Sequence, residues 1–477
     1  MIYSRIMNTK IKNTKIVATL GPASAKEDVL EKMFKEGLNV IRMNFSHGDQ
    51  ASHQKNLNLV RKVAKKTGSN ISILQDLSGP KIRIGDFKDG KIVLKKGQTF
   101  TLTTKKILGD ESIVYINYEK LPKEIKPGSS IMIFDGKINL KVKSIAGEEI
   151  KCTVVEGGEI SNRKGVNVPG ANLSIKSLTE KDKTDIEFGV KNKVEFVAFS
   201  FVRTAGDVLE LRSILDKAKS KSLIISKIET TEAVENFDEI LKVTDGVMVA
   251  RGDLAVEVGA ENVPVLQKDF ISKCNKAGKP VVTATQMLDS MEHSPVPTRA
   301  EVSDVANAIF DGTDAVMLSG ETATGQFPVE SIKVMSRVAL VSEESLPLRK
   351  FIDLDGDEEV VNAVTLSVVR VAEDVNAKAI IALTESGLTA RMITRFRTPF
   401  KIFSISPHEF ACKQLVLSYG VYPVKMLCSK NVDVFTKQIT KFVVENNIAK
   451  KGEKVVVSAG MPFGKVGSTN TLLVLTI

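Results

Sequence analysis

Two short segments carry residues suited to binding a divalent cation beside a positive charge. The first reads Ser-Lys-Ile-Glu over residues 226–229, and the second reads Arg-Gly-Asp over residues 251–253. Hard cations such as Mg²⁺ and Mn²⁺ prefer oxygen ligands, commonly one or two carboxylates together with substrate oxygens and water. Glu229 and Asp253 therefore predict a metal site. Lys227 precedes Glu229 by two residues, which places both side chains on one face of a strand.

A lysine beside such a metal suits phosphoryl transfer, because stabilising the charge of the transferring group is the main catalytic contribution in that reaction. Arg42, Arg83 and Lys164 supply further positive charge from other parts of the chain. Together these groups fit a phosphoryl group, a metal and a second polyphosphate. A purely structural network of buried ion pairs is the alternative explanation.

The elements that must position these residues follow a regular alternation. Short runs of Val, Ile, Leu and Ala are separated by amphipathic stretches of helix length, which is typical of parallel βαβ units. The predicted strands span residues 15–20, 39–44, 71–76, 194–201, 223–227, 246–250, 280–284 and 314–319. Eight such strands predict an α/β fold, a (β/α)₈ TIM barrel.

Polar residues occupy the C-terminal ends of seven predicted strands. They lie at residues 42–48, 76–83, 200–203, 227–229, 251–253, 285–286 and 319–322. Any one of them can be an ordinary helix cap. In a TIM barrel, however, these ends converge on the face that carries the active site. Their number favours a catalytic rim.

One interval between strands, after Asp76, is far too long for a single helix. Residues 81–168 alternate Val, Ile and Thr between turn signals such as Asp89-Gly90 and Pro127-Gly128. They predict a small all-β domain inserted in a βα loop, where it can act as a lid. The catalytic barrel then comprises residues 1–80 and 169–345. Residues 346–477 predict a C-terminal α/β regulatory domain, with strands at 379–383, 401–405 and 454–458.

Composition limits the partners and the compartment. The formal net charge is +10, but the chain has no Trp and five Tyr and lacks an Arg-rich run interleaved with aromatics. Sites for anionic metabolites are therefore favoured over nucleic acid. Four single cysteines without a CxxC pair argue for a reducing compartment. No signal peptide and no run of about 20 apolar residues is visible, so we expect a cytoplasmic protein with no membrane partner, whether Met1 or Met7 is its start.

The order of the longer motifs identifies a family resemblance. Residues 14–24 read Thr-Lys-Ile-Val-Ala-Thr-Leu-Gly-Pro-Ala-Ser, and residues 42–48 read Arg-Met-Asn-Phe-Ser-His-Gly. Further motifs occupy residues 164–170, 225–229, 248–254, 284–288, 297–301 and 317–323. In this order they resemble pyruvate kinase along essentially the whole chain. The resemblance implies transfer of the phosphoryl group of phosphoenolpyruvate to ADP, giving ATP and pyruvate in the last step of glycolysis.

The resemblance also implies roles for single residues. Lys227 would stabilise the phosphoryl group in transit, Arg42 would grip it, and Glu229 with Asp253 would hold Mg²⁺ or Mn²⁺. The substrate-binding residues would be Arg42, Ser200, Gly252, Asp253 and Thr285. The region of Thr285, Ser319 and Glu321 would protonate the enolate, with the donor left open. The residues facing the nucleotide would be Asn44, Ser46, His47, Arg83 and Lys164.

One departure from many family members concerns the monovalent cation. Members that need K⁺ carry Glu at the position of Lys81 and Thr at that of Ile84. The chain is therefore similar to the K⁺-independent subgroup, in which the Lys81 ammonium would supply the missing charge. Asn44, Ser46 and Asp76 resemble the family's K⁺ ligands and are present, so whether K⁺ still binds stays open. A solvent-facing Lys81 is the alternative.

The C-terminal region contains a candidate effector site. Thr384, Ser386, Gly387 and Thr389 lie in a loop that opens a predicted helix, where free backbone N–H groups favour phosphate. The loop resembles the phosphate-binding loop of the family's allosteric sugar-phosphate site; an ordinary helix cap is the alternative. Residues 460–470 lack the Trp and Arg that some fructose-1,6-bisphosphate-activated members use, so the effector's identity stays open. The resemblance favours a homotetramer.

Two other functions compete with this interpretation. A barrel lyase or aldolase could handle pyruvate with Mg²⁺ on two carboxylates, but it would need neither the lid nor the rim around Arg42. A non-catalytic sensor of phosphorylated metabolites would work through the C-terminal domain. The complete set of Lys227, Glu229, Asp253 and Thr285 argues against an inactive barrel.

Overall fold

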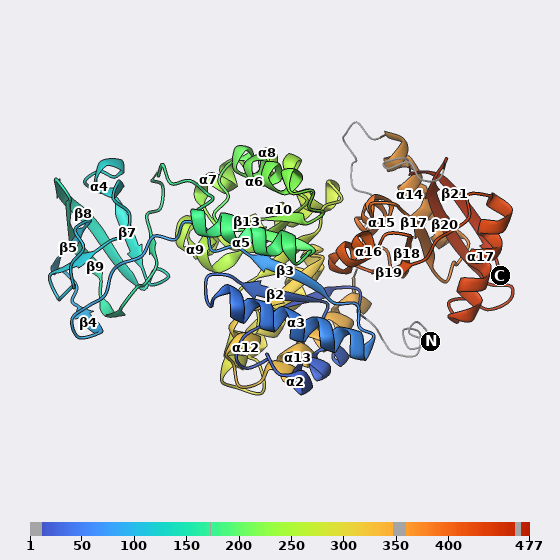
Figure 1. Ribbon diagram of the computed structural model, residues 1–477, viewed down its shortest axis with the longest axis horizontal. Coiled ribbons are helices and arrows are strands. Elements are labelled where there is room, and N and C mark those ends of the chain that lie inside the picture. The colour runs from blue at the N-terminus through green and yellow to red at the C-terminus, as the bar shows by residue number, and fades with distance from the viewer. Residues whose placement is uncertain (1–11, 172, 347–358, 463–468) are drawn as a thin grey trace.

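The chain folds into three bodies arranged in a row, with the barrel in the middle (Figure 1). The computed structural model describes residues 12–171, 173–346, 359–462 and 469–477. The inserted domain lies at one end of the barrel and the C-terminal domain at the other (Figure 1). Any ligand held between two of these bodies therefore meets the barrel at a defined end.

The central barrel is closed and entirely parallel. Around its circumference the strands run in the order β1, β2, β3, β12, β13, β14, β15 and β16. Their bounds are Lys15–Thr19, Val40–Asn44, Ser72–Asp76, Phe196–Phe199, Leu223–Ile228, Gly246–Ala250, Val281–Ala284 and Ala315–Leu318. All eight predicted strands are confirmed. The strands are nearly continuous apolar runs because both faces are covered, as parallel sheets require.

Helices surround the strands and create two layers of core. Inward-facing residues such as Val17 and Leu74 fill the barrel, whereas their neighbours Ile16 and Ile73 pack outward against the helices. The helices are α2 (Glu27–Lys35), α3 (Gln50–Thr67), α5 (Glu180–Lys191), α6 (Ala205–Lys217), α7 (Thr231–Glu235), α8 (Phe237–Val243), α9 (Arg251–Val258), α10 (Val263–Lys276), α11 (Arg299–Asp311), α12 (Gly320–Ala323) and α13 (Pro328–Glu344). Four of them, α3, α5, α6 and α11, begin with a capping box, which satisfies N–H groups left free at the start of a helix.

The inserted domain is a β structure with its own core. Its strands are β4 (Lys91–Leu94), β5 (Thr99–Thr103), β6 (Ile113–Tyr115), β7 (Ser130–Ile133), β8 (Ile138–Ala146), β9 (Glu149–Glu156), β10 (Gly158–Ser161) and β11 (Val166–Asn167). Gly90 and Gly128, both in predicted turns, have φ of 76° and 90°, which favour glycine. The predicted β domain is confirmed: its strands form a six-stranded sheet in the order β11-β7-β8-β9-β5-β6 and a two-stranded sheet of β10 and β4. It also contains α4 (Leu121–Glu124), a single helical turn with a proline at its start.

The C-terminal domain has a five-stranded sheet in the order β19-β18-β17-β20-β21. The strands are β17 (Ile380–Leu383), β18 (Ile402–Ser406), β19 (Val421–Lys425), β20 (Lys454–Gly460) and β21 (Thr469–Thr476), with helices α14 (Glu359–Asp374), α15 (Leu388–Thr394), α16 (Glu409–Gln414) and α17 (Val432–Glu445). The three predicted strands are confirmed. The two edge strands were missed: β19 contains Pro423, and β21 pairs antiparallel with β20.

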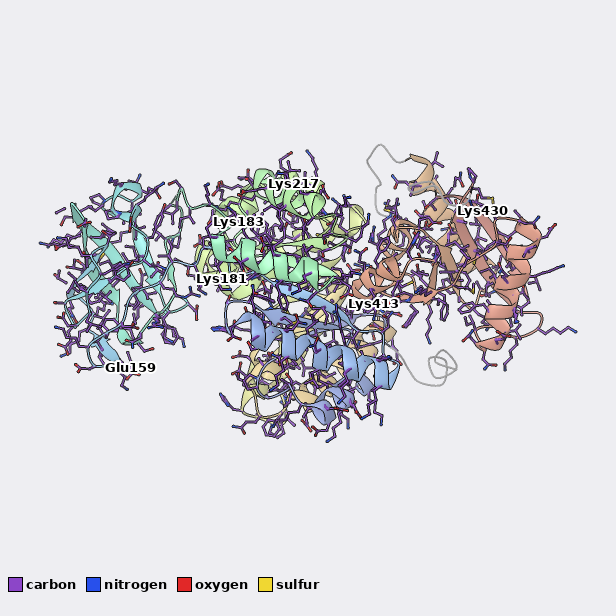
Figure 2. All side chains as sticks on the ribbon, viewed as in Figure 1. Glu159, Lys181, Lys183, Lys217, Lys413 and Lys430 are labelled. Atoms are coloured by element: carbon purple, nitrogen blue, oxygen red, sulfur yellow. The ribbon has the colours of Figure 1, made fainter. Side chains whose placement is uncertain are left out.

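Buried polar contacts attach the C-terminal domain to the N-terminal face of the barrel. Arg397 pairs with Asp314, just before β16, and both side chains are 3% exposed. Lys413 on α16 lies where the two bodies meet (Figure 2) and donates to the backbone oxygen of Ile71, just before β3. The inserted domain therefore covers the opposite face, where the strands end.

The fold bears on two expectations, the absence of a membrane partner and the absence of a disulfide framework. Among the described helices, none is both long and apolar enough to cross a membrane. All four cysteines are free.

Candidate active site

A buried cluster of charges occupies the C-terminal ends of β2, β3, β12 and β13. The Nζ of Lys227 donates to the Oγ of Ser200 at 2.7 Å and lies 3.4 Å from the Oδ1 of Asp76. The Nε of Arg42 donates to the other Asp76 oxygen, Oδ2, at 2.6 Å. Ser200 also donates to the Oδ1 of Asp76 at 3.2 Å. The carboxylate of Asp76 thus contacts both Arg42 and Lys227, and the hydroxyl of Ser200 orients Lys227.

The pKa values follow from burial and charge pairing. Burial alone would raise the pKa of Asp76, but Lys227 and Arg42 hold it below its usual range. Burial works the other way on Lys227, yet Asp76 and Glu229 raise the pKa of its ammonium above the ordinary value. Lys227 is therefore a fixed positive charge, suited to stabilising an anion rather than to accepting a proton.

Glu229 and Asp253 provide oxygen atoms suited to a divalent cation. One Glu229 oxygen, Oε2, accepts a 2.7 Å hydrogen bond from the Phe201 backbone. The other, Oε1, is buried and forms an ion pair with the Nζ of Lys227, 2.9 Å away. Burial, together with the charge of Asp253, keeps the pKa of Glu229 above its usual range against the pull of Lys227. An added cation would relieve the repulsion between the two carboxylates.

The donor set fits Mg²⁺ or Mn²⁺. Within the described part of the chain, no group of three or more His, Cys, Asp or Glu side chains converges as a complete metal cage. A site with two carboxylates suits Mg²⁺, which usually keeps water and substrate oxygens among its ligands. Glu229 and Asp253 would supply the protein's share.

The ends of β14 and β15 place Thr285 beside Gly252. Thr285 and Gln286 have φ of 71° and 53°, and such strained residues cluster at functional sites. The backbone N–H of Gly252 donates to the Oγ1 of Thr285 at 2.9 Å. This hydrogen bond fixes the threonine hydroxyl at the start of α9, next to Asp253.

Sequence reasoning missed Arg251, which holds this strained turn in place. Its guanidinium donates to the backbone oxygen of Thr285 at 2.7 Å and pairs with both oxygens of Asp304 at 2.7 Å. The Arg-Gly-Asp segment drew attention to its aspartate, and only the fold turns the arginine toward β15. Thr19 was missed in the same way; its hydroxyl accepts a 2.9 Å hydrogen bond from Arg42.

The end of β16 adds a buried carboxyl group. The two Glu321 oxygens accept hydrogen bonds from the backbone of Leu288 at 3.0 Å and of Ser319 at 2.7 Å. Burial raises the pKa of Glu321. The hydroxyl of Ser319 is buried without a hydrogen-bond partner. The structure places Ser319 and Glu321 side by side at the rim.

The segments that connect the inserted domain to the barrel carry three cations, of which Lys81 contacts the rim. The Nζ of Lys81 lies 3.8 Å from the Oδ1 of Asp253. Lys164 lies with its Nζ 4.3 Å from the centre of the Phe134 ring. Arg83 forms a β-bridge with Gly165, next to Lys164 in the chain. These three cations come from the two segments that connect the inserted domain to the barrel.

The end of β2 presents the remaining predicted nucleotide residues. Arg42 and Asn44 are two residues apart on the strand and share a face. The Oδ1 of Asn44 accepts a 3.1 Å hydrogen bond from the Ser46 backbone, and His47 is exposed in the following turn. The structure shows no direct contact of these side chains with Lys81 or Lys164.

The predicted effector loop lies far from this rim, between β17 and α15. Gly387 has φ of 92° and donates to the hydroxyl of Thr384 at 2.8 Å. The Nη1 of Arg391 donates to the backbone oxygen of Ser386 at 3.4 Å. The Thr389 hydroxyl is buried against that of Thr469, at 2.7 Å. Residues 463–468 of the later loop lie outside the described residues.

Comparison with known proteins gives one consistent result. The family described as pyruvate kinase, barrel domain, matches residues 11–332, and pyruvate kinase, alpha/beta domain, matches residues 362–475. A pyruvate kinase of Staphylococcus saprophyticus is 46% identical over 97% of this chain and 80% of its own length. One of Staphylococcus epidermidis is 44% identical, with the same coverage. The crystal structure of a Cryptosporidium parvum pyruvate kinase has a TM-score of 0.89 and 38% identity over 98% of this chain and 96% of its own. The chain belongs to the pyruvate kinase family.

Proposed function

We propose that the charge cluster around Lys227 performs the family's reaction, transfer of the phosphoryl group from phosphoenolpyruvate to ADP to give ATP and pyruvate. The observation that carries this proposal is the placement of a fixed ammonium beside a buried carboxylate that is also exposed to the charge of a second carboxylate, Asp253. The Lys227 Nζ lies 2.9 Å from the Oε1 of Glu229. A transferring phosphoryl group is stabilised by such an ammonium together with a metal ion held by the carboxylates.

Each side of the cluster has a separate task. Arg42 binds the phosphoryl group of phosphoenolpyruvate, and Lys227 stabilises its charge as it moves between the two oxygens. Asp76 and Ser200 keep these cations in position, so little reorganisation is needed during the reaction. Bound at Glu229 and Asp253, Mg²⁺ or Mn²⁺ supplies a further positive charge to the substrate oxygens.

The ends of β14 to β16 accommodate the pyruvate part of the substrate. Gly252, Asp253 and Thr285 line it, and the enolate left after transfer is protonated in the region of Thr285, Ser319 and Glu321. The fixed Thr285 hydroxyl and the raised pKa of Glu321 support this assignment, because a carboxyl group must be protonated to deliver a proton.

ADP binds between the barrel and the inserted domain. Asn44, Ser46 and His47 contribute from the barrel, and Arg83 and Lys164 contribute from the inserted domain. Closure of the inserted domain excludes water that would otherwise hydrolyse the phosphoenolpyruvate. The position of both cations on the hinge segments supports this arrangement.

The site works without K⁺. Both Asp76 oxygens already contact Arg42 or Lys227, which leaves little negative charge for a monovalent ion beside Asn44 and Ser46. The Lys81 ammonium, 3.8 Å from Asp253, supplies a positive charge at the rim instead.

The C-terminal domain is regulatory. A phosphorylated effector binds at the loop containing Thr384, Ser386, Gly387 and Thr389, and the nearby guanidinium of Arg391 supports an anion there. The chain works as a homotetramer in the cytoplasm, as its relationship to the family supports.

Lys227→Met tests the proposed role of the ammonium. The variant should still bind metal and phosphoenolpyruvate, while ADP-dependent pyruvate release in a coupled assay falls by several orders of magnitude. Turnover near that of the unmodified enzyme would refute the role. Pyruvate release that needs no ADP would instead favour a lyase.

A further inference from the structure

Helix α9 connects the proposed metal site to the inserted domain. Asp253 lies in its first turn, and Glu257 follows four residues later on the same side of the helix. The Nδ2 of Asn167 donates a 3.1 Å hydrogen bond to the Oε1 of Glu257. Asn167 belongs to β11, which pairs with β7 inside the inserted domain. This hydrogen bond therefore crosses from the barrel to the inserted domain.

A second contact joins α9 to the turn between β7 and β8. A carbon added at the Cα of Gly136 would lie 3.8 Å from a methyl group of Val256, so the turn packs against the helix. Phe134 opens the same turn and holds Lys164 over its ring at 4.3 Å. Helix α9 thus supports the residue proposed to meet the nucleotide phosphates.

The segment from Lys164 to Asn167 is held at two points. A carbon added at Gly165 would lie 2.8 Å from the Cε of Lys81, so the Lys81 stem packs against this backbone while its ammonium reaches Asp253. Asn167 is held by Glu257, one turn further along α9. Residues 164–167 therefore lie along α9, from the turn that carries Asp253 to the turn that carries Glu257.

Other polar contacts also cross this side of the hinge, because Arg203 of the barrel donates to the backbone oxygens of Leu173, at 2.6 Å, and of Ile175. A cavity of about 170 Å³ lies between the two bodies, lined by Phe201 from the barrel side and by Val166 and Val168 from the inserted domain. The position of the inserted domain then depends on the polar contacts that cross the hinge.

We propose that Glu257 is a positioning residue that couples the metal site to closure of the inserted domain over ADP. The inference rests on the proposed function, because it takes Asp253 as a metal ligand and Lys164 as a nucleotide residue. By holding Asn167, Glu257 keeps the segment of Lys164 alongside the metal-binding turn of α9. Metal and nucleotide then favour the same position of the inserted domain, so each strengthens binding of the other.

Steady-state kinetics test the coupling. Glu257→Ala should raise the KM for ADP about tenfold, the size expected for a lost hydrogen bond to a charged group, and change kcat at saturating ADP by less than about twofold. Glu257→Gln should behave like the unmodified enzyme, since its amide oxygen still accepts from Asn167. Asn167→Ala should match Glu257→Ala, and the double variant should be no worse than either. Glu261 is an exposed glutamate just beyond α9, so Glu261→Ala is the matched control.

Hydrogen exchange of the full-length protein provides a readout that a merely structural role would not move. Mn²⁺ should slow amide exchange in residues 164–171 of the unmodified enzyme and of Glu261→Ala, but not of Glu257→Ala. An unchanged KM for ADP with retained Mn²⁺ protection would overturn the inference, as would a raised KM shared by Glu261→Ala. If Glu257→Ala does not fold, Asn167→Ala removes the same hydrogen bond from the other side and decides the question. An inactive Lys227→Met beside normal coupling in Glu257→Ala would refute this inference alone.

Discussion

The barrel carries a buried ion-pair network at each end, and the two differ in whether groups of like charge are brought together. At the N-terminal face, Arg397 pairs with Asp314 at 2.8 Å, and the other Asp314 oxygen accepts a 2.9 Å hydrogen bond from the Tyr419 backbone. At the C-terminal face, Glu229 pairs with Lys227 at 2.9 Å, but burial and the nearby charge of Asp253 keep the pKa of Glu229 above its usual range.

This difference separates a structural network from a functional one. A buried polar atom without a partner costs free energy, so a network that only joins two domains should be fully paired. The network around Arg397 meets that criterion. The network around Glu229 also pairs its charges, but it brings Glu229 near a second carboxylate, Asp253, and this repulsion is explained if a cation completes the site.

Removing the cation of the fully paired network should have the largest effect. Arg397→Met leaves Asp314 buried without its partner and should lower the free energy of unfolding by about 3–5 kcal/mol. Urea unfolding followed by circular dichroism measures this loss. The folded fraction should keep kcat within about twofold. A stable but inactive variant would show that the network around Arg397 is also functional.

A smaller effect is expected from Arg251, which supports the strained turn at Thr285. Arg251→Met removes the hydrogen bond to the Thr285 oxygen and the pair with Asp304, so the hydroxyl is held less precisely. We expect kcat to fall roughly 10- to 100-fold, the scale of misplaced catalytic groups. The exposed Arg299 on α11 offers the control Arg299→Met. Equal kcat values for the two variants would remove Arg251 from the site.

The smallest effect concerns the monovalent cation. The unmodified enzyme should show full activity in K⁺-free buffer, because Lys81 supplies the charge. Lys81→Glu should reduce that activity about tenfold, a change of the size expected from one nearby charge, and added KCl should restore it. Strong activation of the unmodified enzyme by KCl would show that Lys81 does not replace the ion.

The sequence predicted those parts of the fold that depend on local pattern. Each barrel strand is a buried apolar run that ends in polar residues, so both the strands and the site at their ends could be located. Strand β19 was missed because Pro423 interrupts its pattern, which is tolerated only at a sheet edge. Strand β21 pairs antiparallel at the other edge, and nothing local predicts that partner.

Contacts between segments far apart in the chain could not be predicted. The site depends on Arg251 reaching Thr285 and Asp304, and on Asn167 reaching Glu257. Each of these contacts requires two elements to be placed in space before either side chain has a direction. Lys81 was singled out by its residue type, but only the hinge brings its ammonium to Asp253.

Mn²⁺ titration of Glu229→Gln tests whether the Glu229 carboxylate belongs to a metal site. Isothermal titration with phosphoenolpyruvate present should show Mn²⁺ binding to the unmodified enzyme and to folded Arg397→Met. Glu229→Gln should weaken that binding at least about 100-fold, because a neutral amide replaces one of two carboxylate ligands. An unchanged Mn²⁺ affinity in Glu229→Gln would show that Glu229 is not a metal ligand.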